Sequence, residues 1–136
     1  MSLIATFFLA SPADAVRYAT APEDFPEAVD YGGFTALELS TLWAIIRGTD
    51  WTNDLLDEFD CLYHEADMTM IHQIPSDMNR MLVTLAPDQI REANALWADT
   101  EEMDCSPDAI RPILDDLVRL AGLALESGQQ VFLFNA

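Results

Sequence analysis

Apolar residues recur with strand-like spacing at the two ends of the chain and with helix-like spacing between them. Residues 2–9 are apolar on both alternating faces, with Phe7 on one face and Phe8 on the other. A strand of this kind is covered on both sides. Residues 131–134 have the same character. We therefore expect both terminal strands to lie in one small sheet beneath the helices.

Between these strands, apolar residues repeat every three or four positions, which is typical of helices with one buried face. The clearest start signal is the capping box formed by Thr35 and Glu38. Ser76 is expected to cap a later helix, residues 21–33 to form a loop and residues 68–74 a strand. The expected helices cover residues 12–20, 36–47, 53–65, 77–85, 87–98 and 106–127, with Met78 and Met81 facing inward. The pattern predicts a single α+β domain over residues 1–136, with four to six helices on a small sheet.

The net charge limits which partners this domain can bind. The chain has 24 acidic residues against six arginines, has no lysine, and carries a formal charge of −18. Its 51% apolar content argues for a folded chain despite that charge. Nucleic acids and anionic membranes are bound through clustered basic residues, so both are excluded as partners. Cationic, metallic or neutral partners are favoured instead.

The longest acidic stretch, residues 50–67, contains no lysine or arginine. Such a surface steers a basic protein toward its binding site, and an aromatic residue such as Trp51 or Tyr63 would anchor the contact. We therefore favour a non-catalytic protein that binds a basic partner, as an immunity or regulatory protein does. The expected interface residues are Trp51, Asp54, Asp57, Glu58, Asp60 and Glu65.

The alternative is a metal-dependent or thiol-dependent enzyme built on the same segment. A continuous helix over residues 53–65 would place Asp57, Cys61 and His64 on one face. Carboxylate, thiolate and imidazole all bind transition metals, and further ligands could come from Glu65, Asp67 and His72. Cys61 or Cys105 could also pair with a histidine as a nucleophile. No phosphate-binding glycine loop or Gly-x-Ser-x-Gly elbow occurs, and no cofactor is predicted.

A third interpretation is that the acidity reflects the host and serves no interface. Two cysteines are too few for a secreted disulfide scaffold, and no positive segment precedes the apolar residues 3–10, as a signal peptide requires. No apolar run reaches the ~18 residues that span a bilayer. We therefore expect a cytoplasmic location with free thiols. The sequence leaves the oligomeric state open, as it does whether Cys61 and Cys105 approach each other.

The order of these elements also supports a family resemblance. A short apolar strand, Leu3 to Leu9, precedes a helix capped at Ser11-Pro12, and a later helix starts within Leu85 to Asp88. A long amphipathic helix, Ile113 to Glu126, leads into the apolar strand Gln130 to Phe134. This arrangement resembles the YfbM-like family of small bacterial proteins, although the middle of the chain departs from it. The resemblance implies an α+β fold with the terminal strands together, and it carries no activity.

Overall fold

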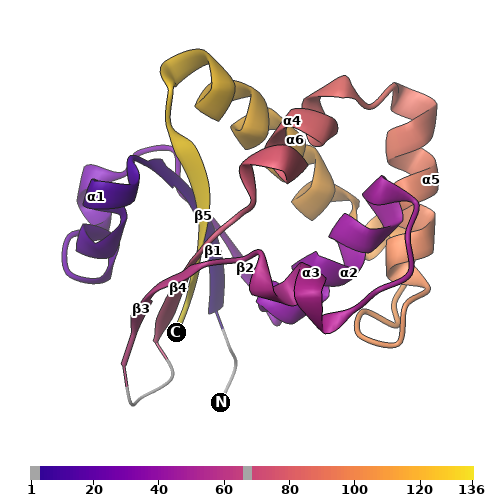
Figure 1. Ribbon diagram of the computed structural model, residues 1–136, viewed down its shortest axis with the longest axis horizontal. Helices are drawn as coiled ribbons and strands as arrows, with labels where there is room; N and C mark the ends of the chain where they lie inside the picture. The colour runs from indigo at the N-terminus through magenta and orange to yellow at the C-terminus, as the bar shows by residue number, and fades with distance from the viewer. Residues whose placement is uncertain (1–3, 66–68) are drawn as a thin grey trace.

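The computed structural model describes residues 4–65 and 69–136, which form an α+β fold (Figure 1). The strands are β1 (Ile4–Ala10), β2 (Val29–Gly32), β3 (Cys61–His64), β4 (Met70–Gln73) and β5 (Gln130–Asn135). The α-helices are α1 (Pro12–Ala15), α2 (Ala36–Arg47), α3 (Asn53–Asp57), α4 (Ser76–Thr84), α5 (Pro87–Ala98) and α6 (Pro107–Ser127). Two short 3-10 helices, η1 (Val16–Ala19) and η2 (Pro22–Asp24), follow α1. Among these residues, no helix is long and apolar enough to cross a membrane.

The two terminal strands pair with each other, as the sequence predicts. The sheet is antiparallel with the order β2-β1-β5-β4-β3, and β1 pairs with β5 from Ala5↔Asn135 to Ala10↔Gln130. The buried side chain of Asn135 donates hydrogen bonds to the carbonyl oxygens of Ile4 at 3.3 Å and Phe34 at 2.8 Å. The two ends of the described chain are therefore fixed in the middle of the sheet, while β2 and β3 form its edges.

Both sides of the sheet are covered, which confirms the two-sided apolar pattern of the terminal strands. Helices α2 to α6 lie on one side, and α1 with η1 and η2 lies on the other (Figure 1). Phe7 and Leu133 contribute to the larger core beneath the helices. Phe8 and Phe132 contribute to a smaller core beneath α1 and the 3-10 helices. The sheet thus separates two apolar layers of unequal size.

The prediction of a loop over residues 21–33 is wrong, because this segment contains η2 and the edge strand β2. β2 pairs with β1 from Ile4↔Gly32 to Phe7↔Val29. The hydroxyl of Thr6 donates to the carboxylate of Asp30 at 2.7 Å. A four-residue strand that ends in glycine has too little alternation to be recognised. Pairing with β1 decides its conformation.

The start of α4 also differs from the prediction. Pro75 is the residue before the helix, and Ser76 is its first residue, so Ser76 does not cap it. The Ser76 hydroxyl instead donates to the side-chain oxygen of Gln130 at 2.9 Å, which ties α4 to β5. Met78 is buried as expected, whereas Met81 lies at the surface. α4 therefore presents a narrower apolar stripe to the core than its sequence suggested.

Candidate functional site

The segment 50–65 folds as a short helix, a turn and an edge strand. Leu55 and Phe59 are buried in the larger core and fix α3 and the turn after it. The helix predicted over residues 53–65 is wrong because the second half of this segment pairs with β4. The backbone N–H of Gln73 donates to the backbone carbonyl of Asp60 at 2.8 Å. Sheet pairing therefore satisfies backbone groups that the predicted helix would have paired internally.

The division of this segment between α3 and β3 contradicts the helix face on which the metal hypothesis rests. Asp57 is the last residue of α3 and Cys61 the first of β3, so Asp57, Cys61 and His64 do not share a helix face. Cys61 is exposed, and its thiol donates to the Tyr63 carbonyl at 3.3 Å. Within residues 4–65 and 69–136, no group of three or more His, Cys, Asp or Glu side chains could hold a metal ion. Asp67, the other acidic candidate, lies outside the described residues.

The arginines do not neutralise the acidic segment. Each of the six forms ion pairs: Arg17 with Asp14 and Asp24, Arg47 with Glu58, Arg80 with Asp77, Arg91 with Asp88, Arg111 with Asp115, and Arg119 with Glu27 and Asp116. Within the part of residues 50–67 that the structure describes, Glu58 alone has an arginine partner, at 3.2 Å. The exposed carboxylates of Asp54, Asp57 and Asp60 have none among the described residues. Among the described residues of this segment, an arginine therefore compensates the negative charge at Glu58 alone.

Helix α2 holds the aromatic and acidic parts of this surface together. The Trp43 indole N–H donates to Glu58 at 3.1 Å, and the Arg47 guanidinium lies 5.2 Å from the centre of the Trp43 ring. The Trp51 indole N–H donates to the Ser40 hydroxyl at 2.8 Å. Ser40 and Trp43 are three positions apart and so are neighbours on the helix surface. Trp51 and Glu58 therefore lie against the same side of α2, with Trp51 still 39% exposed.

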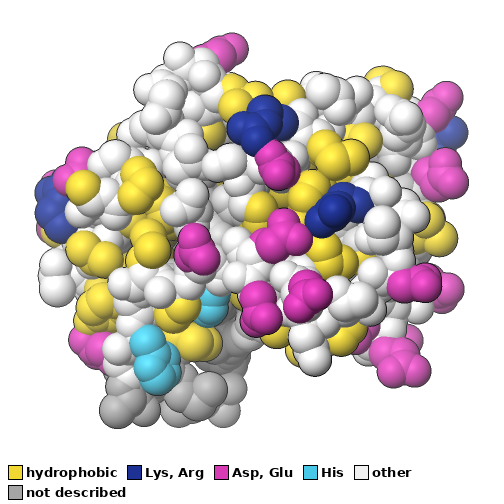
Figure 2. All heavy atoms as spheres, viewed as in Figure 1, with side chains coloured by type: hydrophobic (Ala, Val, Ile, Leu, Met, Phe, Trp, Pro, Cys, Tyr) yellow, Lys and Arg dark blue, Asp and Glu magenta, His cyan; other side chains and the backbone are white. Residues whose placement is uncertain are grey.

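A shallow groove of about 270 Å³ adds a carboxylate that the sequence did not point to. It lies where the turn before β3 meets α4, and its lining consists of Glu58, Asp60, Gln73, Pro75, Ser76 and Asp77. Asp77 reaches this surface through the pairing of β3 with β4. We name Asp54, Asp57, Glu58, Asp60 and Asp77 together the acidic face. Figure 2 shows acidic side chains gathered over this part of the molecule.

Glu65, the remaining residue expected at the interface, lies beyond the other end of β3. At ~3.3 Å per residue, the five residues from Asp60 to Glu65 span about 16 Å. Glu65 accepts a hydrogen bond from the Tyr63 hydroxyl on the β3–β4 hairpin. The structure therefore separates Glu65 from the acidic face.

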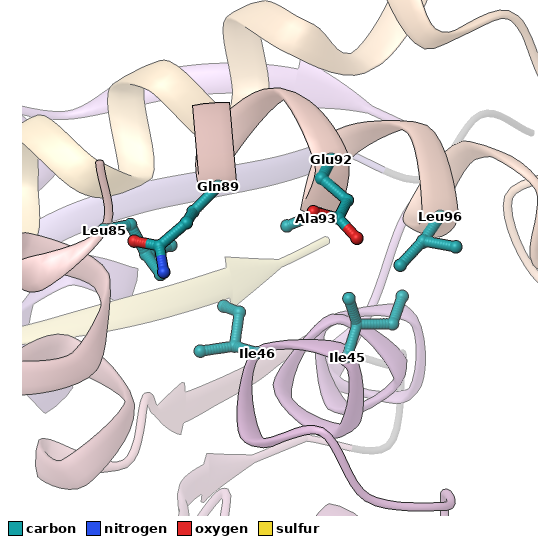
Figure 3. Close-up of a pocket in the computed structure, with 7 residues that line it drawn as sticks. All are labelled: Ile45, Ile46, Leu85, Gln89, Glu92, Ala93 and Leu96. Carbon is teal, nitrogen blue, oxygen red and sulfur yellow. The ribbon is translucent and has the colours of Figure 1, made fainter. Parts of the chain in front are cut away.

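A second groove, of about 200 Å³, runs between α2 and α5 (Figure 3). We name it the α2–α5 groove, and its lining consists of Ile45, Ile46, Leu85, Gln89, Glu92, Ala93 and Leu96. Leu96 is 52% exposed at its edge. Ile46 directly precedes Arg47, which pairs with Glu58. The groove and the acidic face thus adjoin at the C-terminal end of α2.

His72 lies on β4 opposite Cys61 and Leu133. Because Leu133 contributes to the larger core, His72 points toward the helical side of the sheet. Its Nδ1 atom is buried and has no hydrogen-bond partner among the residues described. Burial lowers the pKa of His72 below its ordinary value of 6.5, and the neighbouring His64 lowers this pKa further. The folded state therefore favours the neutral imidazole.

We expect His72 to make stability depend on pH. A lowered folded-state pKa means that the unfolded chain binds the proton more tightly. The resulting contribution of His72 to the free energy of unfolding is complete above about pH 6.5 and is lost as the pH falls through the lowered pKa. His72→Gln should remove it, so the difference in Tm between wild type and variant should change between pH 7.5 and 5. His64→Gln removes only the smaller of the two causes that lower the pKa of His72, so it should change this pH dependence less than His72→Gln does. Parallel Tm curves for wild type and His72→Gln would contradict the assignment.

Comparisons of the chain with protein-family models, with curated proteins and with solved structures find no match. The resemblance to the YfbM-like family therefore stands on the order of elements alone and stays a proposal. The function proposed below rests on the geometry and charge of the surface.

Proposed function

We propose that the protein is a non-catalytic binding protein whose acidic face takes a basic protein partner, as an immunity or regulatory protein does. One observation carries this proposal: every arginine already has a carboxylate partner, while Asp54, Asp57 and Asp60 have no cation beside them within the described residues. Uncompensated surface charge of one sign raises the association rate of an oppositely charged protein by ~10- to 10³-fold.

Trp51 supplies the contact that carboxylates lack. Its ring is held against α2 by the hydrogen bond to Ser40, so little side-chain entropy is lost when a partner covers it. Tryptophan is enriched among the residues that dominate binding energy. The acidic face therefore attracts the partner, and Trp51 holds it once water is excluded. Glu65, on the hairpin, adds only long-range charge in this arrangement.

The first experiment is capture of partners from a native lysate on the immobilised protein at low ionic strength. Elution with a salt gradient separates specific binding from general charge attraction, because the Debye length falls from ~10 Å at 0.1 M to ~3 Å at 1 M salt. We expect one basic protein to elute at intermediate salt. A broad range of unrelated basic proteins would favour the interpretation that the acidity reflects the host.

The association rate of the captured partner then tests the acidic face itself. The triple variant Asp54→Asn, Asp57→Asn, Asp60→Asn should lower this rate by about tenfold at low salt and by little at 1 M salt. The control removes three charges from the α5–α6 connection by Asp99→Asn, Glu101→Gln, Glu102→Gln, which are also exposed. It should lower the rate by less than about twofold. Equal slowing by both triple variants would show that only net charge matters and would reject the proposed face.

A further inference from the structure

The α2–α5 groove combines apolar walls with a single carboxylate. Ile45 and Ile46 project from α2 toward α5, and Leu96 faces them from α5 (Figure 3). The Glu92 carboxylate points toward the space between the two helices. Gln89 also lines the groove from α5. The groove is therefore apolar along α2, and along α5 it is partly polar with one carboxylate.

Its size limits what it can hold. The volume of about 200 Å³ is below the ~300–1,000 Å³ of typical small-molecule and cofactor sites. One or two protein side chains fit such a space, whereas a cofactor or a whole helix does not. The occupant is therefore part of a larger molecule that docks over the groove.

The charges around the groove select the type of side chain. Glu92 has no ion-pair partner in the part of the chain that the structure describes. Two arginines directly follow or precede residues that line the groove, and both are already paired: Arg91 with Asp88 at 3.0 Å and Arg47 with Glu58 at 3.2 Å. Arginine and lysine have long apolar stems that cover hydrophobic surface while their charged ends stay at its edge. A stem between α2 and α5 would place its cationic end beside Glu92.

We propose that the α2–α5 groove receives one arginine side chain of the basic partner, with its stem against Ile45, Ile46 and Leu96 and its guanidinium at Glu92. This inference rests on the proposed function and adds a specificity contact to it. A second copy of this chain is a poor occupant, because it carries a net charge of −18 and all of its arginines are paired within the fold. The groove adjoins the acidic face at the end of α2, so a single basic surface would contact both.

The test uses a capped heptapeptide with one arginine among alanines and leucines. Its matched control has citrulline, the neutral isostere, in place of arginine. Methyl NMR of the protein labelled at isoleucine and leucine should show saturable shifts at Ile45, Ile46 and Leu96 with the arginine peptide. The citrulline peptide should bind about fivefold more weakly or worse, because it lacks the charge-assisted hydrogen bond.

Two variants locate the charge that is recognised. Glu92→Gln should weaken binding of the arginine peptide about as much as the citrulline substitution does. Glu101→Gln, which changes an exposed carboxylate in the α5–α6 connection and leaves the Arg91–Asp88 pair in place, should leave the affinity unchanged. Equal affinity for the two peptides, or no shift at the three methyl-bearing residues, would overturn the proposal. Dimerisation that buries these methyl groups would also overturn it, because the occupant would then be a second copy.

The peptide experiment needs no natural partner, so it is independent of the test of the proposed function. If the groove binds the peptide but the association rate of the captured partner does not depend on the charge of the acidic face, the proposed function is wrong and the groove assignment is kept. If the partner depends on the acidic face but the peptide does not bind, only the groove assignment fails.

Discussion

Trp97→Ala is expected to lower the free energy of unfolding by about 3–5 kcal/mol. Trp97 is fully buried and packs α5 against α2 in the larger core. Its indole N–H donates to the carbonyl of Glu38, near the start of α2, at 3.0 Å. The substitution leaves a large cavity between helices that are also the walls of the α2–α5 groove. Urea unfolding would measure the loss, and Tm should fall by at least about 10 °C.

Two controls separate the cavity from the hydrogen bond. Trp97→Phe keeps most of the apolar volume and loses the indole donor. The Glu38 carbonyl keeps the Thr41 hydroxyl at 2.6 Å as a donor, so the lost hydrogen bond itself should cost only about 1 kcal/mol. Trp51→Ala, at a partly exposed ring, should cost clearly less than Trp97→Ala. If Trp51→Ala and Trp97→Ala were equally destabilising, the burial difference between the two tryptophans would be wrong.

The elements that could be predicted are those whose signals are local. α2 begins after Thr35, whose hydroxyl accepts from the Leu37 amide at 3.3 Å. It ends at Arg47, and the next residue, Gly48, has a φ of +72°, where a residue with a side chain would be strained. The pairing of the terminal strands could be predicted because strands that are apolar on both faces belong inside a sheet. In these cases a few adjacent residues suffice to define the structure.

The elements that could not be predicted depend on contacts between distant residues. Residues 53–65 contain apolar positions that suit a helix, yet only Asn53–Asp57 are helical. The rest pairs with β4, and the register of that pairing shifts between Cys61 and Tyr63. Tertiary pairing overrides a weak local preference here. The proposed metal ligands Asp57, Cys61 and His64 do not share a face for the same reason, because that face exists only on the predicted helix.

The candidate site shows the same division. Trp51, Asp54, Asp57, Glu58 and Asp60 are adjacent in the sequence, so composition alone pointed to them. Asp77 could not be assigned to this surface without knowing that β4 leads α4 back beside β3. The α2–α5 groove was equally hidden, because it forms only when two helices separated by some forty residues pack together. Sequence therefore gives the charge of the surface, and tertiary structure gives its shape.

The smaller core provides the second large expected effect. Phe8→Ala should lower the free energy of unfolding by about 3–5 kcal/mol. Phe8 is fully buried, and its ring centre lies 4.3 Å from that of Tyr18, 5.3 Å from Phe25 and 5.4 Å from Phe132. These rings connect the 3-10 segments to the sheet, so removal of the Phe8 ring removes its contacts with all three of them. Phe8→Leu keeps an apolar side chain and should cost less.

Tyr18 reports on this layer directly. Burial raises the pKa of its phenol above the ordinary value of 10.0, and the nearby charge of Asp30 raises it further. In Phe8→Ala, water reaches the Tyr18 ring, so the phenol should titrate closer to 10.0 in an ultraviolet pH titration of a chain in which Tyr31 and Tyr63 are replaced by phenylalanine. Phe8→Leu should keep the raised pKa. An unchanged Tyr18 titration in Phe8→Ala would contradict the packing described for this side of the sheet.

The same variant tests whether the two layers unfold together. Trp43 and Trp97 are buried on the helical side, whereas Tyr18 lies on the other side. With Tyr31 and Tyr63 replaced by phenylalanine, tyrosine absorbance follows Tyr18 alone, so it and tryptophan fluorescence follow different layers. β1 and β5 contribute side chains to both cores. We therefore expect the two signals to shift to the same lower midpoint in urea, as two-state unfolding requires. An earlier tyrosine transition would show that the 3-10 segments separate first, leaving the sheet, α2 and the proposed binding surface intact.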